Sequence, residues 1–186
     1  MKSFFYLAIA ALSILAGCAS IEPPLASTAL PEKGFGYISS LAYTSTTQDF
    51  SLTLENTATG KKYGLPLGDS SSPAANLSDK ITAIKVPTGK YKLVNWSDDG
   101  IFLNGLKNSA SGAHPLMQAF TVSDGSVTVL GRFILDRDVK AGFPYTWITN
   151  SIRPGPISEK EVKELFHAAY PLLTEKSLSC LACTDY

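Results

Sequence analysis

Apolar and polar side chains alternate with a period of two along most of residues 34–135. In the first clear case Phe50, Leu52 and Leu54 alternate with polar residues, as in a strand with one face in a core and one face in water. The same period predicts further strands at 62–66, 81–86, 91–96, 120–122 and 127–135. Short alternating strands with Gly- and Pro-rich turns predict a mainly β fold, for which we expect an antiparallel β-sandwich.

Turn-forming residues separate these strands. Residues 56–60 (Asn-Thr-Ala-Thr-Gly) predict a turn into the strand at 62–66. Pro87-Thr88-Gly89 and Ser123-Asp124-Gly125 each stand between two predicted strands. We therefore expect a β-hairpin at each of these two turns.

The period changes to that of a helix at residues 158–169. Ser158 is a favourable N-cap residue, and Glu161 three positions later completes a capping box. Ile157 and Val162 occupy the two positions of a hydrophobic staple. An apolar stripe that would dock on the core consists of Val162, Leu165, Phe166 and Ala169.

The N-terminus has the layout of a secretory signal peptide. Lys2 provides a positive start, an apolar run covers residues 4–14, and small residues follow in Leu15-Ala16-Gly17-Cys18. These last four residues resemble the lipobox of bacterial lipoprotein precursors. In that family the cysteine thiol takes up a diacylglyceryl chain, and cleavage before it frees an α-amino group for a further acyl chain. The resemblance implies removal of residues 1–17 and a lipid on Cys18.

Two other interpretations of this segment remain open. Residues 3–21 contain no charge and could just span a bilayer as an uncleaved anchor. In the second, the signal peptide is an ordinary one and Cys18 is incidental. If the lipid is present, the membrane is the expected partner, because two or three acyl chains give lasting attachment. In the lipoprotein family of Gram-negative cells, Ala19 and Ser20 after the cysteine imply the outer membrane.

The other two cysteines form a Cys-x-x-Cys pair near the C-terminus. Once Cys18 is assigned to lipid, a disulfide between Cys180 and Cys183 is the default in an oxidising compartment. Two free thiols, a redox-active pair and a metal site are the alternatives, although Thr184 replaces the histidine of a haem attachment. Because the ring is short and lies near the chain end, we expect it to stabilise the fold little.

Charge and motif content argue against several function classes. The 16 basic and 16 acidic residues balance without a basic cluster, which argues against nucleic acid as a partner. Gly68-Asp69-Ser70 is similar to the nucleophile block of Gly-Asp-Ser lipases, but Glu164-x-x-His167 replaces their Asp-x-x-His pair. His114 lies in a predicted loop, and Asp136-Arg137-Asp138 predicts a solvated turn. We expect no metal ion and no cofactor.

An aromatic stripe follows the last predicted strands. Phe143, Tyr145 and Trp147 fall on one side of a strand expected at 143–149, and Pro144 assigns that strand to a sheet edge. Such a stripe could bind a sugar or a peptide. Large apolar side chains more often fill a sandwich interior, so we expect these three in the core.

The predicted strands also carry a resemblance to a family. Val86-Pro87-Thr88-Gly89-Lys90-Tyr91 resembles the apolar-Pro-x-Gly-x-Tyr hairpin of prealbumin-like and carboxypeptidase-regulatory-like β-sandwiches, and Phe120-x-Val122 with residues 125–131 resembles two later strands. Bacterial lipoproteins with such a domain often carry a C-terminal helix ending in Tyr-Pro, as in Tyr170-Pro171 here. The resemblance covers residues 34–135. It implies a sandwich but no constant active site.

These patterns divide the chain into four segments. Residues 1–17 are the signal peptide, and residues 18–33, with three prolines among small residues, form a flexible tether. Residues 34–150 form the β-sandwich, and residues 151–186 form the helix and a tail that packs on the sandwich or extends from it.

Two function classes follow. We expect a non-catalytic binding or assembly module, anchored in the cell envelope through Cys18, with an envelope protein as its partner. The alternative is an envelope enzyme or redox protein that uses Cys180 and Cys183 or the Ser70 loop. The alternative requires a cleft with converging polar groups.

Overall fold

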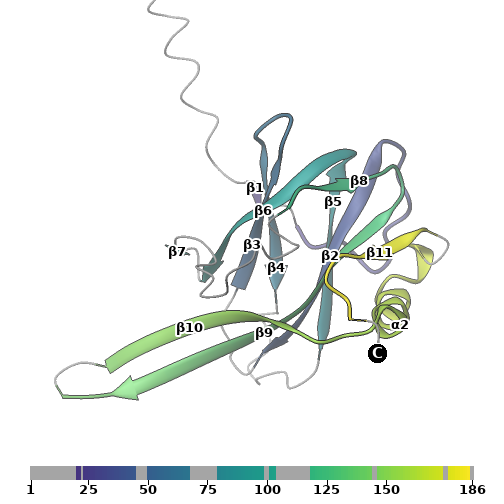
Figure 1. Cartoon of the computed structure of the whole chain (residues 1–186). Helices are drawn as coiled ribbons and strands as arrows, with labels where there is room; N and C mark the ends of the chain where they lie inside the picture. The colour runs from purple at the N-terminus through teal and green to yellow at the C-terminus, as the bar shows by residue number, and fades with distance from the viewer. Residues whose placement is uncertain are drawn as a thin grey trace, which may run out of the picture.

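Two β-sheets pack face to face in the computed structural model, and one helix covers the outer face of the second sheet (Figure 1). The structure describes residues 20–21, 23–44, 50–67, 79–98, 101–103, 118–143, 146–173 and 176–184. The mainly β class with a helix near the C-terminus, predicted from the sequence, is confirmed.

The first sheet has the order β1 (Ser20–Ile21), β4 (Lys62–Leu67), β3 (Phe50–Asn56), β6 (Gly89–Asp98) and β7 (Ile101–Leu103), and β8 (Phe120–Val122) also pairs with β6. The second has the order β10 (Thr146–Gly155), β9 (Val127–Ala141), β2 (Phe35–Thr44) and β5 (Lys80–Pro87), and β11 (Leu178–Cys180) also pairs with β9. Helix α2 (Glu159–Ala169) and the 3-10 turn η3 (Pro171–Leu173) follow β10. The pairings β1–β4, β2–β9 and β11–β9 are parallel, so the sheets are mixed rather than purely antiparallel as expected.

The two β-hairpins expected at residues 87–89 and 123–125 are wrong. Strand β5 pairs with β2 in the second sheet, whereas β6 pairs with β3 in the first. Strands β8 and β9 are divided between the sheets in the same way. The turns at Thr88 and at Asp124 therefore cross from one sheet to the other. Alternation reports only that one face of a strand is buried, and strands of both sheets of a sandwich bury one face in the same core.

Two separate clusters of buried side chains hold the layers together. The first lies between the sheets, and among its largest members are Phe50, Leu52, Leu54, Tyr91 and Phe133. The second lies between the second sheet and α2 and includes Tyr37, Leu41, Val129, Val162 and Phe166. Apolar burial on both faces makes the second sheet the central layer of the fold.

Helix α2 begins and docks largely as its sequence predicts. The Ser158 hydroxyl accepts a hydrogen bond from the Glu161 N–H at 3.2 Å, and Ile157 and Val162 are both buried in the second cluster. Val162 and Phe166 are buried, and the partly buried Leu165 and Ala169 pack against the same cluster, so the predicted stripe docks on the core. The C-cap residue Tyr170 packs in the same cluster.

The segment expected to be a flexible tether lies along the second sheet. The Leu25 N–H donates to the Ala83 carbonyl at 2.8 Å, and the Tyr37 hydroxyl donates to the Leu30 carbonyl at 3.3 Å. Glu32 forms an ion pair with Lys85. Leu25 also packs against the second cluster. The prolines of this segment disfavour a long regular element, but they prevent neither the two-residue strand β1 nor docking, because an extended chain can still hydrogen bond to a sheet edge.

The C-terminal part of the chain continues the second sheet. Strand β10 spans residue 150, where a boundary between the sandwich and the C-terminal segment was expected, so the two are one unit. Residues 181 and 182 then pack against the first cluster, and the Leu181 N–H donates to the Val129 carbonyl at 2.9 Å. The tail is therefore part of the sandwich and does not extend from it.

Candidate functional site

A long hairpin of β9 and β10 projects beyond the two sheets (Figure 1). Strand β2 pairs with β9 only as far as Leu135, while β10 accompanies β9 to Ala141. We call residues 136–143 and 146–151 the projecting hairpin. In the described part of the chain β10 pairs with β9 alone, so its other edge keeps the unpaired N–H and C=O groups of an edge strand.

The tip of the projecting hairpin exposes an aromatic side chain. Phe143 lies in a bend after β9 with a relative exposure of 101%, so its expected place in the core is wrong. Tyr145 and the side chain of Trp147 lie outside the described residues. The chain bends at Phe143, so this residue is not part of a strand. The alternation that assigned its side chain to one face of a sheet therefore does not apply to it. Single exposed apolar side chains are common on protein surfaces, so Phe143 is a candidate contact for a partner only together with the edge of β10 that follows it.

Charged pairs fix the base of the projecting hairpin. Asp136 lies in β9, not in the solvated turn expected there, and its carboxylate accepts from Arg153 of β10 at 3.1 Å. Arg132 binds Asp79 at 2.7 Å and lies over the Tyr43 ring at 5.4 Å. The half-buried Arg132–Asp79 pair orders this base better than the exposed Asp136–Arg153 pair does, because exposed ion pairs contribute little.

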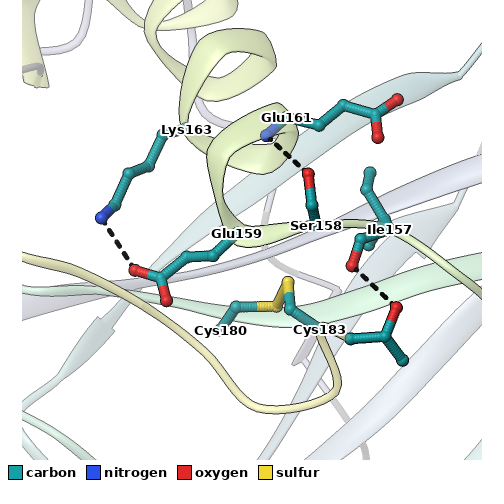
Figure 2. The surroundings of a disulfide bond; sticks show 8 residues. Ile157, Ser158, Glu159, Glu161, Lys163, Cys180 and Cys183 are labelled. Atoms are coloured by element: carbon teal, nitrogen blue, oxygen red, sulfur yellow. Dashed lines mark hydrogen bonds and ion pairs between the residues drawn. A yellow bond between two sulfur atoms is a disulfide. The ribbon is translucent and has the colours of Figure 1, made fainter. Parts of the chain in front are cut away.

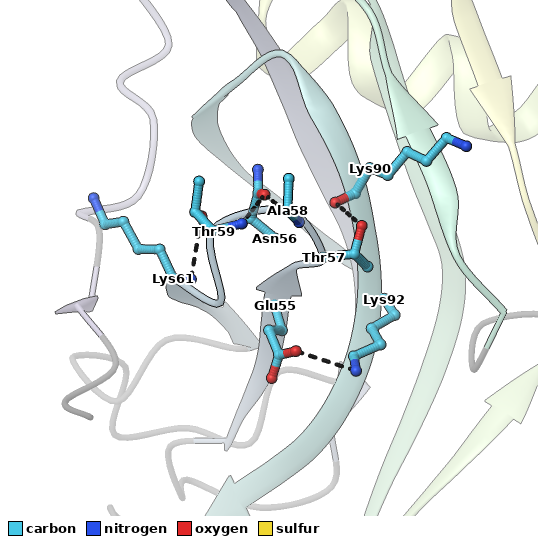
Figure 3. A network of polar contacts seen from close by, with 8 residues as sticks. All are labelled: Glu55, Asn56, Thr57, Ala58, Thr59, Lys61, Lys90 and Lys92. Carbon is cyan, nitrogen blue, oxygen red and sulfur yellow. Dashed lines mark hydrogen bonds and ion pairs between the residues drawn. The ribbon is translucent and has the colours of Figure 1, made fainter. Parts of the chain in front are cut away.

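A polar turn, residues 57–60, joins β3 to β4 at the end of the first sheet away from the projecting hairpin (Figure 3). The Asn56 side-chain oxygen accepts from the backbone N–H of Ala58 at 3.0 Å and of Thr59 at 3.1 Å. Gly60 completes the turn with a φ of 69°, which favours glycine. The Thr57 N–H donates to the Lys90 carbonyl at 2.9 Å, which attaches the turn to β6. The sequence predicts this turn, and the signal is the presence of two turn-forming residues, Asn56 at its start and Gly60 at its end.

Four lysines surround this turn, and sequence reasoning missed them as a group. Lys61 and Lys90 are exposed, and the Lys61 ammonium lies 4.7 Å from the centre of the Tyr63 ring. Lys92 binds Glu55 at 3.1 Å on the neighbouring strand. Lys62 stands opposite the same Glu55 in the β3–β4 pair. They were missed because the four belong to two segments some 30 residues apart, which only the sheet brings together.

The chain enters the fold beside this group. Ser20 and Ile21 of β1 pair in parallel with Tyr63 and Gly64 of β4. Because the strands are parallel, β1 begins beside the end of β4 at which Lys61 and Lys62 lie. We call the turn 57–60 together with Lys61, Lys62, Lys90 and Lys92 the anchor end. Cys18 itself lies outside the described residues.

Cys180 and Cys183 are joined by a disulfide, with their Cα atoms 5.6 Å apart (Figure 2). Both pack against the second cluster, whereas Leu181 and Ala182 between them pack against the first. The Thr184 N–H donates to the Ile157 carbonyl at 3.0 Å, just before α2 begins. The disulfide thus holds a loop that closes the sandwich beside β9.

The surroundings of the disulfide suit a structural bond better than a redox site. A reactive thiolate needs a nearby cation or a free helix N-terminus. The first turn of α2 instead carries the carboxylates of Glu159 and Glu161, and Ser158 caps its N–H groups. The one basic group drawn beside it, Lys163, is paired with Glu159 at 2.8 Å (Figure 2). This arrangement would not stabilise a thiolate.

The remaining sequence candidates do not assemble into a site. Ser70 and His114 lie outside the described residues, and His167 is a partly buried residue in the last turn of α2. In the part of the chain that the structure describes, no three His, Cys, Asp or Glu side chains are grouped as metal ligands. The same part contains no helix long and apolar enough to cross a membrane.

Two buried tyrosines have shifted acidity. Burial raises the pKa of the Tyr170 hydroxyl, and the hydrogen bond from the Ala83 N–H opposes that shift. Burial likewise raises the pKa of Tyr91, whose hydroxyl donates to the Pro87 carbonyl at 2.6 Å. Both side chains bond to the backbone of β5, so they serve the fold rather than chemistry.

Comparison with known proteins adds no function. No family model matches the chain, and no curated protein matches it. The chain is weakly similar to the crystal structure of a leucine-rich repeat protein from Bacteroides thetaiotaomicron VPI-5482, with 19% identity and a TM-score of 0.32. That match covers 55% of this chain and 12% of the other.

Proposed function

We propose that the protein is a lipid-anchored module of the bacterial cell envelope that binds a protein partner through its projecting hairpin. The anchor is the acylated Cys18, and the outer membrane is the proposed location. The observation that carries the proposal is the position of the hairpin, which leaves the sandwich at the end opposite the entry of the chain at β1.

The length of the hairpin supports a role in reaching a partner. Strand β9 has 15 residues, or about 50 Å at roughly 3.3 Å per residue. Its first residues pair with the start of β2, near the anchor end, and its last residues lie beyond the end of β2. A two-stranded ribbon is only marginally stable by itself, so a long one in a small domain suggests that it is used for contact.

The chemistry of the hairpin suits strand addition by a protein. The outer edge of β10 offers backbone donors and acceptors to a partner strand, and Phe143 offers an apolar anchor at the tip. Aromatic side chains are frequent energetic centres of protein interfaces. This mode needs no cleft and no catalytic group, which distinguishes it from the enzyme alternative.

The proposal is tested by photocrosslinking in intact cells. A photoreactive phenylalanine analogue at position 143 should give one discrete crosslinked product. The same analogue at Leu172, an exposed apolar residue on η3, is the matched control and should not give that product. A second, unlabelled copy of the chain should compete for the partner and lower the yield of this product, but a copy in which Asn-Gly replaces residues 139–148 and joins the paired residues Asp138 and Thr149 should not. Equal crosslinking from both positions would contradict the proposal.

A further inference from the structure

We propose that the anchor end of the sandwich binds the headgroups of anionic phospholipids, so that the projecting hairpin points away from the membrane. The proposal rests on the lipid anchor at Cys18. It adds a surface of the folded domain that contacts the membrane and a fixed orientation, neither of which acylation alone requires.

The first step concerns distance. Cys18 is two residues before Ser20, and two residues span at most about 7 Å. Ser20 is paired with Tyr63, which directly follows Lys61 and Lys62 in the chain. An acyl chain on Cys18 therefore brings the bilayer surface to the anchor end. A tether of 16 residues, as the sequence suggested, would have left the domain free to tumble, but residues 23–33 lie against the second sheet.

The second step concerns charge. Residues 55–62 and 90–92 contain four lysines against the single acidic residue Glu55, whereas the whole chain is balanced. Lys61 and Lys90 are exposed, and the Lys92 side chain is 41% exposed beside Glu55. Lysines near an anionic leaflet are attracted to its lipid phosphates, and the effect of several adds up. None of the four lysines is buried: Lys62 and Lys92 are partly exposed, and Lys61 and Lys90 are exposed.

The third step concerns rigidity. The Asn56 side chain and the Thr57–Lys90 hydrogen bond fix the turn to the sheet. Lys62, Lys90 and Lys92 lie in strands, and Lys61 directly follows the fixed turn, where its N–H donates to the Thr59 hydroxyl at 3.2 Å (Figure 3). The end of the molecule that carries Phe143 is then the one farthest from the bilayer.

The orientation is tested on the acylated full chain in vesicles. A fluorescent donor is placed on Thr59→Cys, or on Ala141→Cys as the matched control, and the vesicles carry an acceptor on lipid headgroups. Both positions are exposed. With phosphatidylglycerol present, energy transfer should be strong from position 59 and weak from position 141. Equal transfer from the two positions would overturn the proposal.

The lysines are tested by removing their charges. Lys61, Lys62 and Lys90 are changed together to Gln, and Lys140, Lys160 and Lys163 are changed together as a control with equal charge loss. In phosphatidylglycerol vesicles the first triple variant should lose part of the position-59 transfer, because Cys18 still holds the anchor end near the bilayer but the lysines no longer fix it to the headgroups, and the control should not change. An unchanged first variant would overturn the lysine surface.

A separate measurement distinguishes failure of this surface from failure of the anchor. Unacylated Cys18→Ser chain should sediment weakly with phosphatidylglycerol vesicles, and the first triple variant should bind about 100-fold more weakly, at about 5-fold per lysine. If intact mass shows no acyl chain on Cys18 but this binding is found, the anchor is wrong and the surface stands. If Cys18 is acylated but the binding is absent, the surface is wrong and the anchor stands.

Discussion

The hydroxyl oxygen of Tyr170 accepts a hydrogen bond from the backbone N–H of Ala83 at 3.0 Å, joining the end of α2 to the outer edge of β5. The carbonyl of the same Ala83 accepts from the N–H of Leu25 at 2.8 Å. Edge strands with open N–H and C=O groups invite unwanted pairing. The helix cap and the N-terminal segment together close the β5 edge at this point, whereas on the opposite side of the sheet β10 has no second partner strand among the described residues.

Removing the Tyr170 hydroxyl should destabilise the fold. The Tyr170→Phe change keeps the ring in the second cluster but leaves a buried N–H at Ala83 without its partner, which costs about 1–3 kcal/mol. Urea unfolding measures this loss. The matched control is Tyr43→Phe, which keeps the ring beneath Arg132 and should cost less than about 0.5 kcal/mol, as at most surface positions. Similar losses from the two variants would show that the Tyr170 bond does not hold the edge.

Stability should fall in alkaline solution because the pKa of Tyr170 is raised by burial above its usual 10.0. The folded chain keeps the phenol proton at a pH where the unfolded chain releases it. The stabilisation is therefore complete below pH 10.0 and is lost as the pH rises through the folded-state pKa. Tyr91 contributes in the same direction. Unfolding followed from pH 8 to 11 should give a shallower decline for Tyr170→Phe than for the normal chain, and parallel declines would contradict the assignment.

Truncation after Ser179 should be more harmful than loss of the disulfide. A four-residue ring constrains the unfolded chain little, so replacing Cys180 and Cys183 with Ala should lower stability modestly. Truncation also removes Leu181, which packs against the first cluster, and should lower stability by about a further 1 kcal/mol, less than the value of a fully buried leucine because Leu181 is only partly buried. Thermal unfolding of the two variants makes the comparison. Equal midpoints would mean that the tail does not close the sandwich.

Helix α2 should depend on Phe166 more than on Leu165. Phe166 is fully buried, and its change to Ala should cost about 3–5 kcal/mol. Leu165 is only partly buried, so Leu165→Ala should cost less than that. Urea unfolding of both variants tests which of the two side chains is buried more deeply against the sheet. A larger loss from Leu165→Ala would place the other face of the helix on the sheet.

The sequence predicts the local elements well and their partners poorly. Alternation places most strands, and the Ser158 cap places the helix, because both signals act within a few residues. Nothing local states that β5 and β6 separate into different sheets, or that Leu25 docks beside Ala83, since those choices depend on contacts between distant segments. The candidate surfaces share this limit. Phe143 reads as a core residue until the hairpin is seen to turn there, and the four lysines become one group only through the pairing of β3, β4 and β6.

The measurement that tests the account most directly is the intact mass of the protein extracted from membranes. The account predicts loss of residues 1–17 and the added mass of a diacylglyceryl group and a further acyl chain on Cys18. The Cys18→Ser chain should lack these groups and should leave the membrane fraction. A normal chain of unprocessed mass, or a Cys18→Ser chain that is still cleaved before residue 18 and stays in the membrane, would contradict the lipid anchor.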